Sequence, residues 1–199
     1  EDLGLFGSTK KKVETEIGLL KSRTLMERTV QSLGINTTYT KKGRVRDVEL
    51  YKNNAPINIR FVTRDTLLYN GNTVFSIKAV SATQFVLENS DGTPGGQYTF
   101  EEVISTDFGT LSVMLTDTKS FNPDDEIFVR IQPIKVLAKQ LNNGLKVELK
   151  YKNASLIELS TNTTIKQKGE DLLNELVRQY NEDAVEDKSV IGKNTEAFI

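Results

Sequence analysis

The strongest constraint on this chain is a change in the spacing of its apolar residues. Both ends carry helical spacing, whereas residues 35 to 134 alternate apolar and polar positions in short, β-branched runs separated by turn residues. Such a segregation of strands from helices indicates an α+β fold. We therefore predict a small mixed-sheet α/β domain with helices from both chain ends, formed by residues 1–52 and 135–199, and an inserted antiparallel β-sandwich or jelly-roll-like unit at residues 53–134.

The front helical segment contains two apolar stripes that one straight helix cannot bury together. The stripes lie on nearly opposite faces and consist of Val13, Ile17 and Leu20, and of Met26, Val30 and Leu33. A break near Ser22 resolves the conflict and predicts helices over 13–21 and 23–33. Thr24 and Glu27 have the spacing of a capping box, and Gly34 is placed as a C-terminal stop. Ser22, Arg23 and Glu27 are therefore candidate structural residues at this break.

The last helical segment carries a seven-residue stripe. Its members are Val177, Ala184, Ile191 and Phe198, with Leu173 and Tyr180 at the intervening position. A helix of about 35 residues would be roughly 50 Å long, which exceeds what one compact domain of this size covers. We expect the stripe to pack on a partner, and we interpret the chain as a segment of a longer protein. Val177, Tyr180, Ala184, Ile191 and Phe198 are the predicted interface residues.

Composition limits the chemistry that the chain can perform. It has no Cys, His or Trp, which removes thiol nucleophiles, the usual general base and most zinc sites. A formal net charge of -1 gives no overall attraction to nucleic acid, so no nucleic-acid partner is predicted. Gly192-Lys193 resembles the end of a phosphate-binding loop, but Asp187 and Asn194 stand where that motif needs Gly and Ser or Thr. We predict no catalytic residue, no cofactor and no metal.

Alternative functions remain open at this stage. Tyrosines at 39, 51, 69 and 98 lie in the strand-rich region 35–134 and could stack on sugars, which would suit a carbohydrate-binding or adhesin-like module. Acidic clusters at 101–102 and 124–126 would support a glycosidase only if separate loops brought two carboxyl groups together. Basic residues at 10–12 and at 41, 42, 44 and 46 could bind phosphate, lipid headgroups or an acidic glycan.

Three segments together resemble one family. They are VETEIGLLKSRTLMERTVQSLGIN at 13–36, VELYKNNAPI at 48–57 and KGEDLLNELVRQYNEDAVEDKSVIGKNTEAFI at 168–199. The chain resembles the extracytoplasmic region of bacterial polysaccharide co-polymerases, the chain-length determinant proteins. It is most similar to the subclass fused to a cytoplasmic tyrosine autokinase for capsular or exopolysaccharide biosynthesis. The resemblance covers both ends, about half of the chain, and the β-rich insertion is similar to the insert of the kinase-fused members.

This resemblance implies a non-catalytic assembly and regulatory domain. The parent would be an inner-membrane protein whose periplasmic portion forms a homo-oligomeric ring and sets polymer length together with the membrane polymerase and export machinery. The exported polysaccharide itself is a candidate partner. Kinase activity would belong to a separate cytoplasmic domain of the parent.

Overall fold

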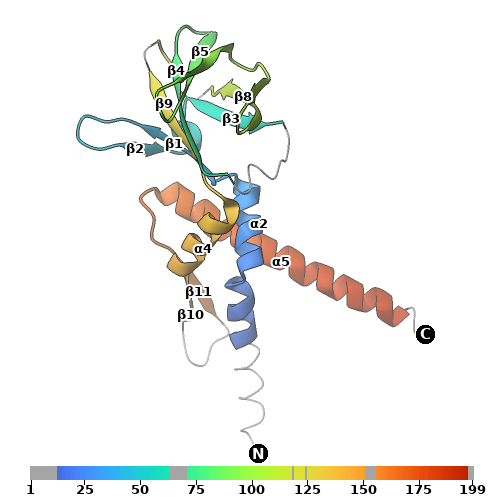
Figure 1. The fold of residues 1–199 in the computed structure, drawn as a ribbon. Helices are drawn as coiled ribbons and strands as arrows, with labels where there is room; N and C mark the ends of the chain where they lie inside the picture. Colours follow the sequence, from blue (N-terminus) through green and yellow to red (C-terminus); the bar gives the residue numbers. More distant parts are fainter. Residues whose placement is uncertain (1–12, 63–70, 118, 124, 151–155, 197–199) are drawn as a thin grey trace, which may run out of the picture. The chain divides into compact units, whose positions relative to one another are not determined.

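The computed structural model describes residues 13–62, 71–117, 119–123, 125–150 and 156–196, with side chains described as far as residue 185. The chain divides into two compact units (Figure 1). One is discontinuous and comprises Glu1–Gly34 and Leu137–Ile199, and the other is Ile35–Val136. The first is built mainly of helices and the second of strands, so the predicted α+β class is confirmed.

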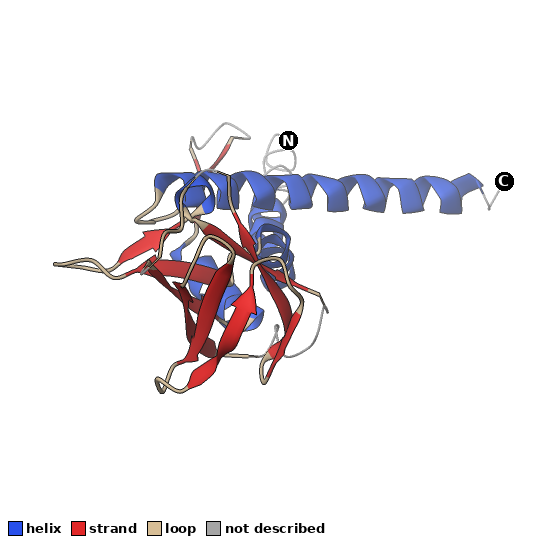
Figure 2. Cartoon of the chain, turned by 90° about the horizontal axis from the view of Figure 1, so that it is seen from above, coloured by secondary structure: helices blue, strands red, loops and turns tan. Residues whose placement is uncertain are grey.

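The β-rich unit consists of two antiparallel sheets (Figure 2). The larger sheet has six strands in the order β2 (Val48–Leu50), β1 (Thr37–Lys41), β9 (Glu126–Ile131), β4 (Thr73–Ala79), β5 (Gln84–Asn89) and β6 (Pro94–Thr99). The smaller has the order β3 (Ile57–Phe61), β8 (Gly109–Leu115) and β7 (Ile104–Thr106). A short 3-10 turn, η1 (Lys52–Asn54), precedes β3.

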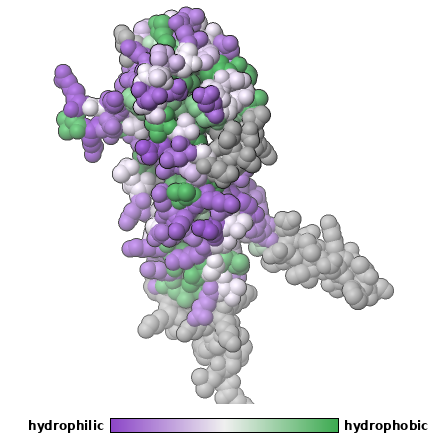
Figure 3. Space-filling view, viewed as in Figure 1, coloured by the Kyte–Doolittle hydropathy of each residue, from purple (hydrophilic) through white to green (hydrophobic). Residues whose placement is uncertain are grey.

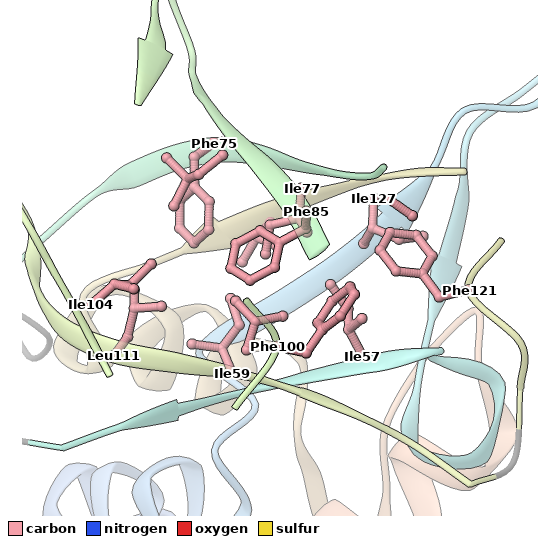
Figure 4. Close-up of a cluster of buried hydrophobic side chains, with 14 of the residues drawn as sticks. Ile57, Ile59, Phe75, Ile77, Phe85, Phe100, Ile104, Leu111, Phe121 and Ile127 are labelled. Carbon is pink, nitrogen blue, oxygen red and sulfur yellow. The ribbon is translucent and has the colours of Figure 1, made fainter. Parts of the chain in front are cut away.

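The core of this unit lies between the two sheets (Figure 4). Strand β3 buries alternate residues, as its apolar-polar sequence INIRF requires. Its Ile57 and Ile59 point toward side chains of the larger sheet, among them Phe75 and Ile77. Aromatic rings continue this layer, with centroids 5.0 Å apart for Phe85 and Phe100 and 6.1 Å apart for Phe100 and Phe121. Burial of this apolar surface from both sheets stabilises the sandwich.

The β-rich unit begins earlier than predicted, at Ile35 instead of residue 53. The reason is β1, which the strand pattern did not identify and which pairs with both β2 and β9. Its sequence TTYTK contains the strand-favouring residues Thr and Tyr but no apolar alternation, so the periodicity of apolar residues did not reveal it. Tyr39 on this strand accepts a hydrogen bond from the Ile59 N–H at 2.9 Å and donates one to Asn58 Oδ1 at 3.1 Å. It therefore links β1 in one sheet to β3 in the other.

The helical unit contains the predicted break and a two-stranded hairpin. Residues 13–20 are helical, and α2 (Arg23–Leu33) follows after Lys21 and Ser22. The second half of the unit comprises most of α4 (Ile134–Gly144), then β10 (Lys146–Leu149), β11 (Ile157–Ser160) and α5 (Lys166–Glu196). Strands β10 and β11 pair antiparallel. Every strand pair described in this unit is antiparallel, which corrects the mixed sheet predicted for it.

Helix α2 begins at Arg23 as predicted, but its cap differs from the predicted capping box. Ser22 is the N-cap of α2, in extended conformation and without a side-chain cap bond, so Thr24 and Glu27 lie inside the helix. Gly34 does end α2, with a left-handed φ of 62°. At α5 the Thr163 hydroxyl binds the Ile165 N–H at 3.2 Å, one residue before the helix begins. The backbone conformation of Ser22, without a side-chain cap, therefore sets the start of α2.

Candidate interaction surface

The break between the first helix and α2 is held by the backbone and by one residue of α4. At the end of the first helix, the Lys21 N–H donates a hydrogen bond to the Ile17 carbonyl at 3.0 Å. At the start of α2, the Met26 N–H donates to the Ser22 carbonyl at 3.1 Å. Asn142 Nδ2 donates to the Lys21 carbonyl at 2.8 Å. Asn142 is 121 residues away from Lys21 in sequence, so sequence spacing gave no signal for this support.

Helix α5 contacts the helices on both sides of the break. The Tyr180 hydroxyl donates to a carboxylate oxygen of Glu16 in the first helix. Less than one turn further along α5, the Asp183 carboxylate accepts hydrogen bonds from both terminal nitrogens of Arg28 in α2. The distance from Arg28 Nη1 to Asp183 Oδ1 is 2.8 Å. This guanidinium lowers the pKa of Asp183. We call Glu16, Arg28, Tyr180 and Asp183 the helix clamp, because one stretch of α5 binds two helices through them.

The other predicted residues of the break lie beside the clamp. Arg23 Nε is 3.8 Å from Glu27 Oε1, and the Arg23 side chain is 63% exposed, so this pair is a surface ion pair along α2. On the buried side of α2, the Thr29 hydroxyl donates a hydrogen bond to the Leu25 carbonyl at 2.8 Å. Ser22 contributes its backbone conformation to the break, and no side-chain cap bond.

A second polar network follows the surface of α5. Glu175 accepts from Arg178 at 2.6 and 2.7 Å and from Gln179 at 3.0 Å, and Ser32 of α2 also donates to it. Arg178 pairs in addition with Glu182. These hydrogen bonds lower the pKa of Glu175 to about 2, and the bond from Arg178 has the largest effect. The i, i+3 and i, i+4 spacings could have been found in the sequence, whereas the Arg28–Asp183 pair spans 155 residues.

The face of α5 that its own unit covers lies beside the predicted stripe. Leu172 and Leu176 are 3% and 0% exposed, one residue before Leu173 and Val177. Val177 is 36% exposed and Val185 68%, so both lie on the outer side of the helix. Tyr180 and Ala184 are half-buried at the border between the two sides. Ile191 lies within α5, but its side chain is outside the described set, and Phe198 is outside the described residues altogether.

Several side chains on which the carbohydrate-binding and glycosidase alternatives depend make contacts within the β-rich unit. Burial raises the pKa of Tyr39 to about 12, and the Tyr98 hydroxyl donates to the Gly95 carbonyl at 2.7 Å. Asp125 pairs with Lys41 at 2.6 Å, and this bond lowers the pKa of Asp125. Glu102 accepts the Thr99 N–H at 3.1 Å. Tyr69 and Asp124 lie outside the described residues.

Over the described part of the chain, no group of three or more Asp or Glu side chains is arranged to hold a metal ion. Within the same residues, no helix combines the length and the apolar character needed to cross a bilayer.

Comparisons with known proteins give little guidance. No protein-family model matches the chain, and no curated protein matches it. Among solved structures, the crystal structure of FlgL from Xanthomonas campestris is similar over 81% of this chain and 49% of that chain, with 10% sequence identity and a TM-score of 0.30. The chain thus spans about half the length of that protein, and a score this low supports no statement about fold or function.

Proposed function

We propose that this chain is an extracytoplasmic assembly and regulatory domain of a membrane protein that controls the length and export of capsular or exopolysaccharide chains. The proposal starts from the sequence resemblance at both ends of the chain. It includes a homo-oligomeric parent in the inner membrane of a bacterium, and it assigns no catalysis to this domain. Kinase chemistry would reside in a separate cytoplasmic domain of the parent.

The observation that carries the proposal is the two-sided character of α5. The helix is 31 residues long, and its inner side is anchored by Leu172, Leu176 and the helix clamp. Its outer side presents Val185, which is 68% exposed, and Val177, which is 36% exposed. Apolar side chains left accessible on a helix that is anchored on its other side are available to a neighbouring subunit. A rigid attachment on one side would hold the other side in a fixed orientation toward a neighbouring subunit.

The carbohydrate-binding alternative gains no support from these contacts. Stacking on sugars needs exposed aromatic faces, whereas Tyr39 and Tyr98 use their hydroxyls within the β-rich unit. A glycosidase would need two carboxyl groups facing one cleft, and Asp125 is instead committed to Lys41.

The test is the molecular mass of the intact membrane protein, measured by light scattering in nanodiscs. We expect the parent to form an assembly, and we expect Val177→Asp with Val185→Asp to reduce it to single subunits and to change the length of the polysaccharide made by cells. Val80→Asp with Val103→Asp is the matched control, because those valines are 44% and 59% exposed in the β-rich unit. A monodisperse monomer of the unmodified parent would refute the proposal.

A further inference from the structure

The loop between β1 and β2 has an unusual exposed tip. All residues from 41 to 48 are exposed, and Val45 is 97% exposed, the highest value among the large apolar side chains described. Arg44 and Arg46 flank it directly. In the space-filling view the hairpin projects from the β-rich unit as a hydrophilic arm with a small hydrophobic patch (Figure 3). We call residues 42–47 the hairpin loop.

The hairpin loop carries a local excess of positive charge on a nearly neutral chain. Lys42, Arg44 and Arg46 stand against one carboxylate, that of Asp47. Next to the loop, Lys41 is neutralised by Asp125 on the β9 side at 2.6 Å. The Lys42 ammonium lies 4.2 Å from the centroid of the Phe128 ring, which fixes the base of the loop to β9. The acids of the adjoining strands are Glu49 on β2 and Glu126 on β9.

The shape of the hairpin loop depends on Gly43. A Cβ at that position would lie 2.1 Å from the Arg46 carbonyl oxygen, a backbone atom that cannot yield by rotating a side chain. The chain therefore closes tightly across Gly43 to Arg46. A loop closed in this way presents its Arg-Val-Arg tip with less conformational entropy to lose on binding than an open loop would have.

We propose that the hairpin loop docks on an anionic phospholipid surface. The guanidinium groups of Arg44 and Arg46 bind lipid phosphates, and Val45 enters the boundary between headgroups and acyl chains. The exposed valine decides between a lipid and an acidic glycan, because a glycan offers no apolar layer for an aliphatic side chain and the loop has no aromatic ring for stacking. The inference rests on the proposed function only in placing a membrane nearby.

The experiment uses the absence of cysteine in this chain. Val45→Cys and, as the control position, Val103→Cys each take a single environment-sensitive fluorophore. We expect the label at position 45 to shift its emission to the blue with phosphatidylglycerol vesicles and not with phosphatidylcholine vesicles, and the label at position 103 to stay in water with both. A label at 45 that stays in water, or one that shifts equally at 103, would overturn the proposal.

Charge variants of the unlabelled chain provide the second measurement, by co-sedimentation at millimolar phosphatidylglycerol. Each cation near such a surface strengthens binding about five-fold, so Arg44→Glu with Arg46→Glu should weaken partitioning by at least about 25-fold. Lys135→Glu with Lys139→Glu makes the same change in net charge at exposed positions of α4 and should leave most of the binding. Equal losses in the two variants would refute docking by this loop. A response of the label at 45 to polygalacturonate without vesicles would refute the lipid in favour of an acidic glycan. None of these readouts depends on polysaccharide export, so they can fail while the proposed function holds.

Discussion

Replacing Gly169 by alanine should destabilise the helical unit, against the usual rule for a helix. Gly169 lies in the first turn of α5, and its N–H binds the Ile165 carbonyl at 3.2 Å. An added Cβ would lie 2.7 Å from Thr163 Cγ2. Thr163 cannot simply rotate its methyl away, because its hydroxyl binds the Ile165 N–H and carbonyl, both at 3.2 Å.

The sign of the effect follows from two opposing contributions. Alanine in place of glycine inside a helix stabilises by about 0.5–1 kcal/mol. Forcing a methyl into a closely packed site costs about 1–3 kcal/mol. We therefore expect Gly169→Ala to lower the free energy of unfolding by about 1 kcal/mol, and by at most about 2.5 kcal/mol.

Thr163→Ser is the matched background, because it removes the methyl and keeps the hydroxyl. In that background the two atoms nearest to the new Cβ are the Cβ of residue 163 and Thr161 Cγ2, each at 3.7 Å, which is ordinary van der Waals contact. In that background Gly169→Ala should stabilise by about 0.5–1 kcal/mol. Urea unfolding followed by circular dichroism at 222 nm would measure all four proteins, since the helices lie mainly in this unit. An equal effect of Gly169→Ala in both backgrounds would refute the packing argument.

Three further predictions follow from the contacts described. Tyr39→Phe leaves the Ile59 N–H without its acceptor and should destabilise the β-rich unit by about 1–2 kcal/mol in urea unfolding; in the unmodified protein, absorbance titration should show one tyrosine that ionises only near pH 12. Leu176→Ala empties a fully buried site on α5 and should cost about 2–5 kcal/mol, whereas Val177→Ala beside it should cost under about 1 kcal/mol. The pKa of Glu175 falls from its ordinary value of 4.5 to about 2 on folding, so its contribution is complete above about pH 5 and is lost as the pH falls toward 2; Glu175→Gln should flatten the loss of stability over that range, and an unchanged slope would refute the assignment.

The elements that the sequence predicted well are those in which burial follows a local period. The opposed stripes of the front segment required a break, and the structure places it at Lys21 and Ser22. The strands of the sandwich likewise follow from alternation, as in Ile57–Phe61. In each case the residues that decide the element are neighbours in sequence, so the pattern contains the necessary information.

What could not be predicted depends on distant partners. Strand β1 is a strand because β2 and β9 bind its backbone on both sides, although its own sequence is polar. The helix clamp unites residues more than 150 positions apart, such as Arg28 and Asp183. Asn142, which supports the helix break, is likewise distant in sequence from its partner Lys21, by 121 residues. No spacing rule along the chain connects such pairs.

The predicted stripe on α5 lies beside the face that the helical unit itself covers. Leu172 and Leu176 face the unit, and the next residues, Leu173 and Val177, lie about 100° further round the helix. One helix can therefore bury one apolar side in its own unit and expose another side to solvent or to a partner. Local side-chain pairs, such as Arg178 with Glu182 just before Asp183, each contribute about 0.2–0.5 kcal/mol to a helix in water. Such pairs are weak compared with the entropy of ordering a dozen residues. The length of α5 is therefore easiest to explain if its outer side is covered in the assembled parent, which ties the stability of the helix to the assembly proposed for it.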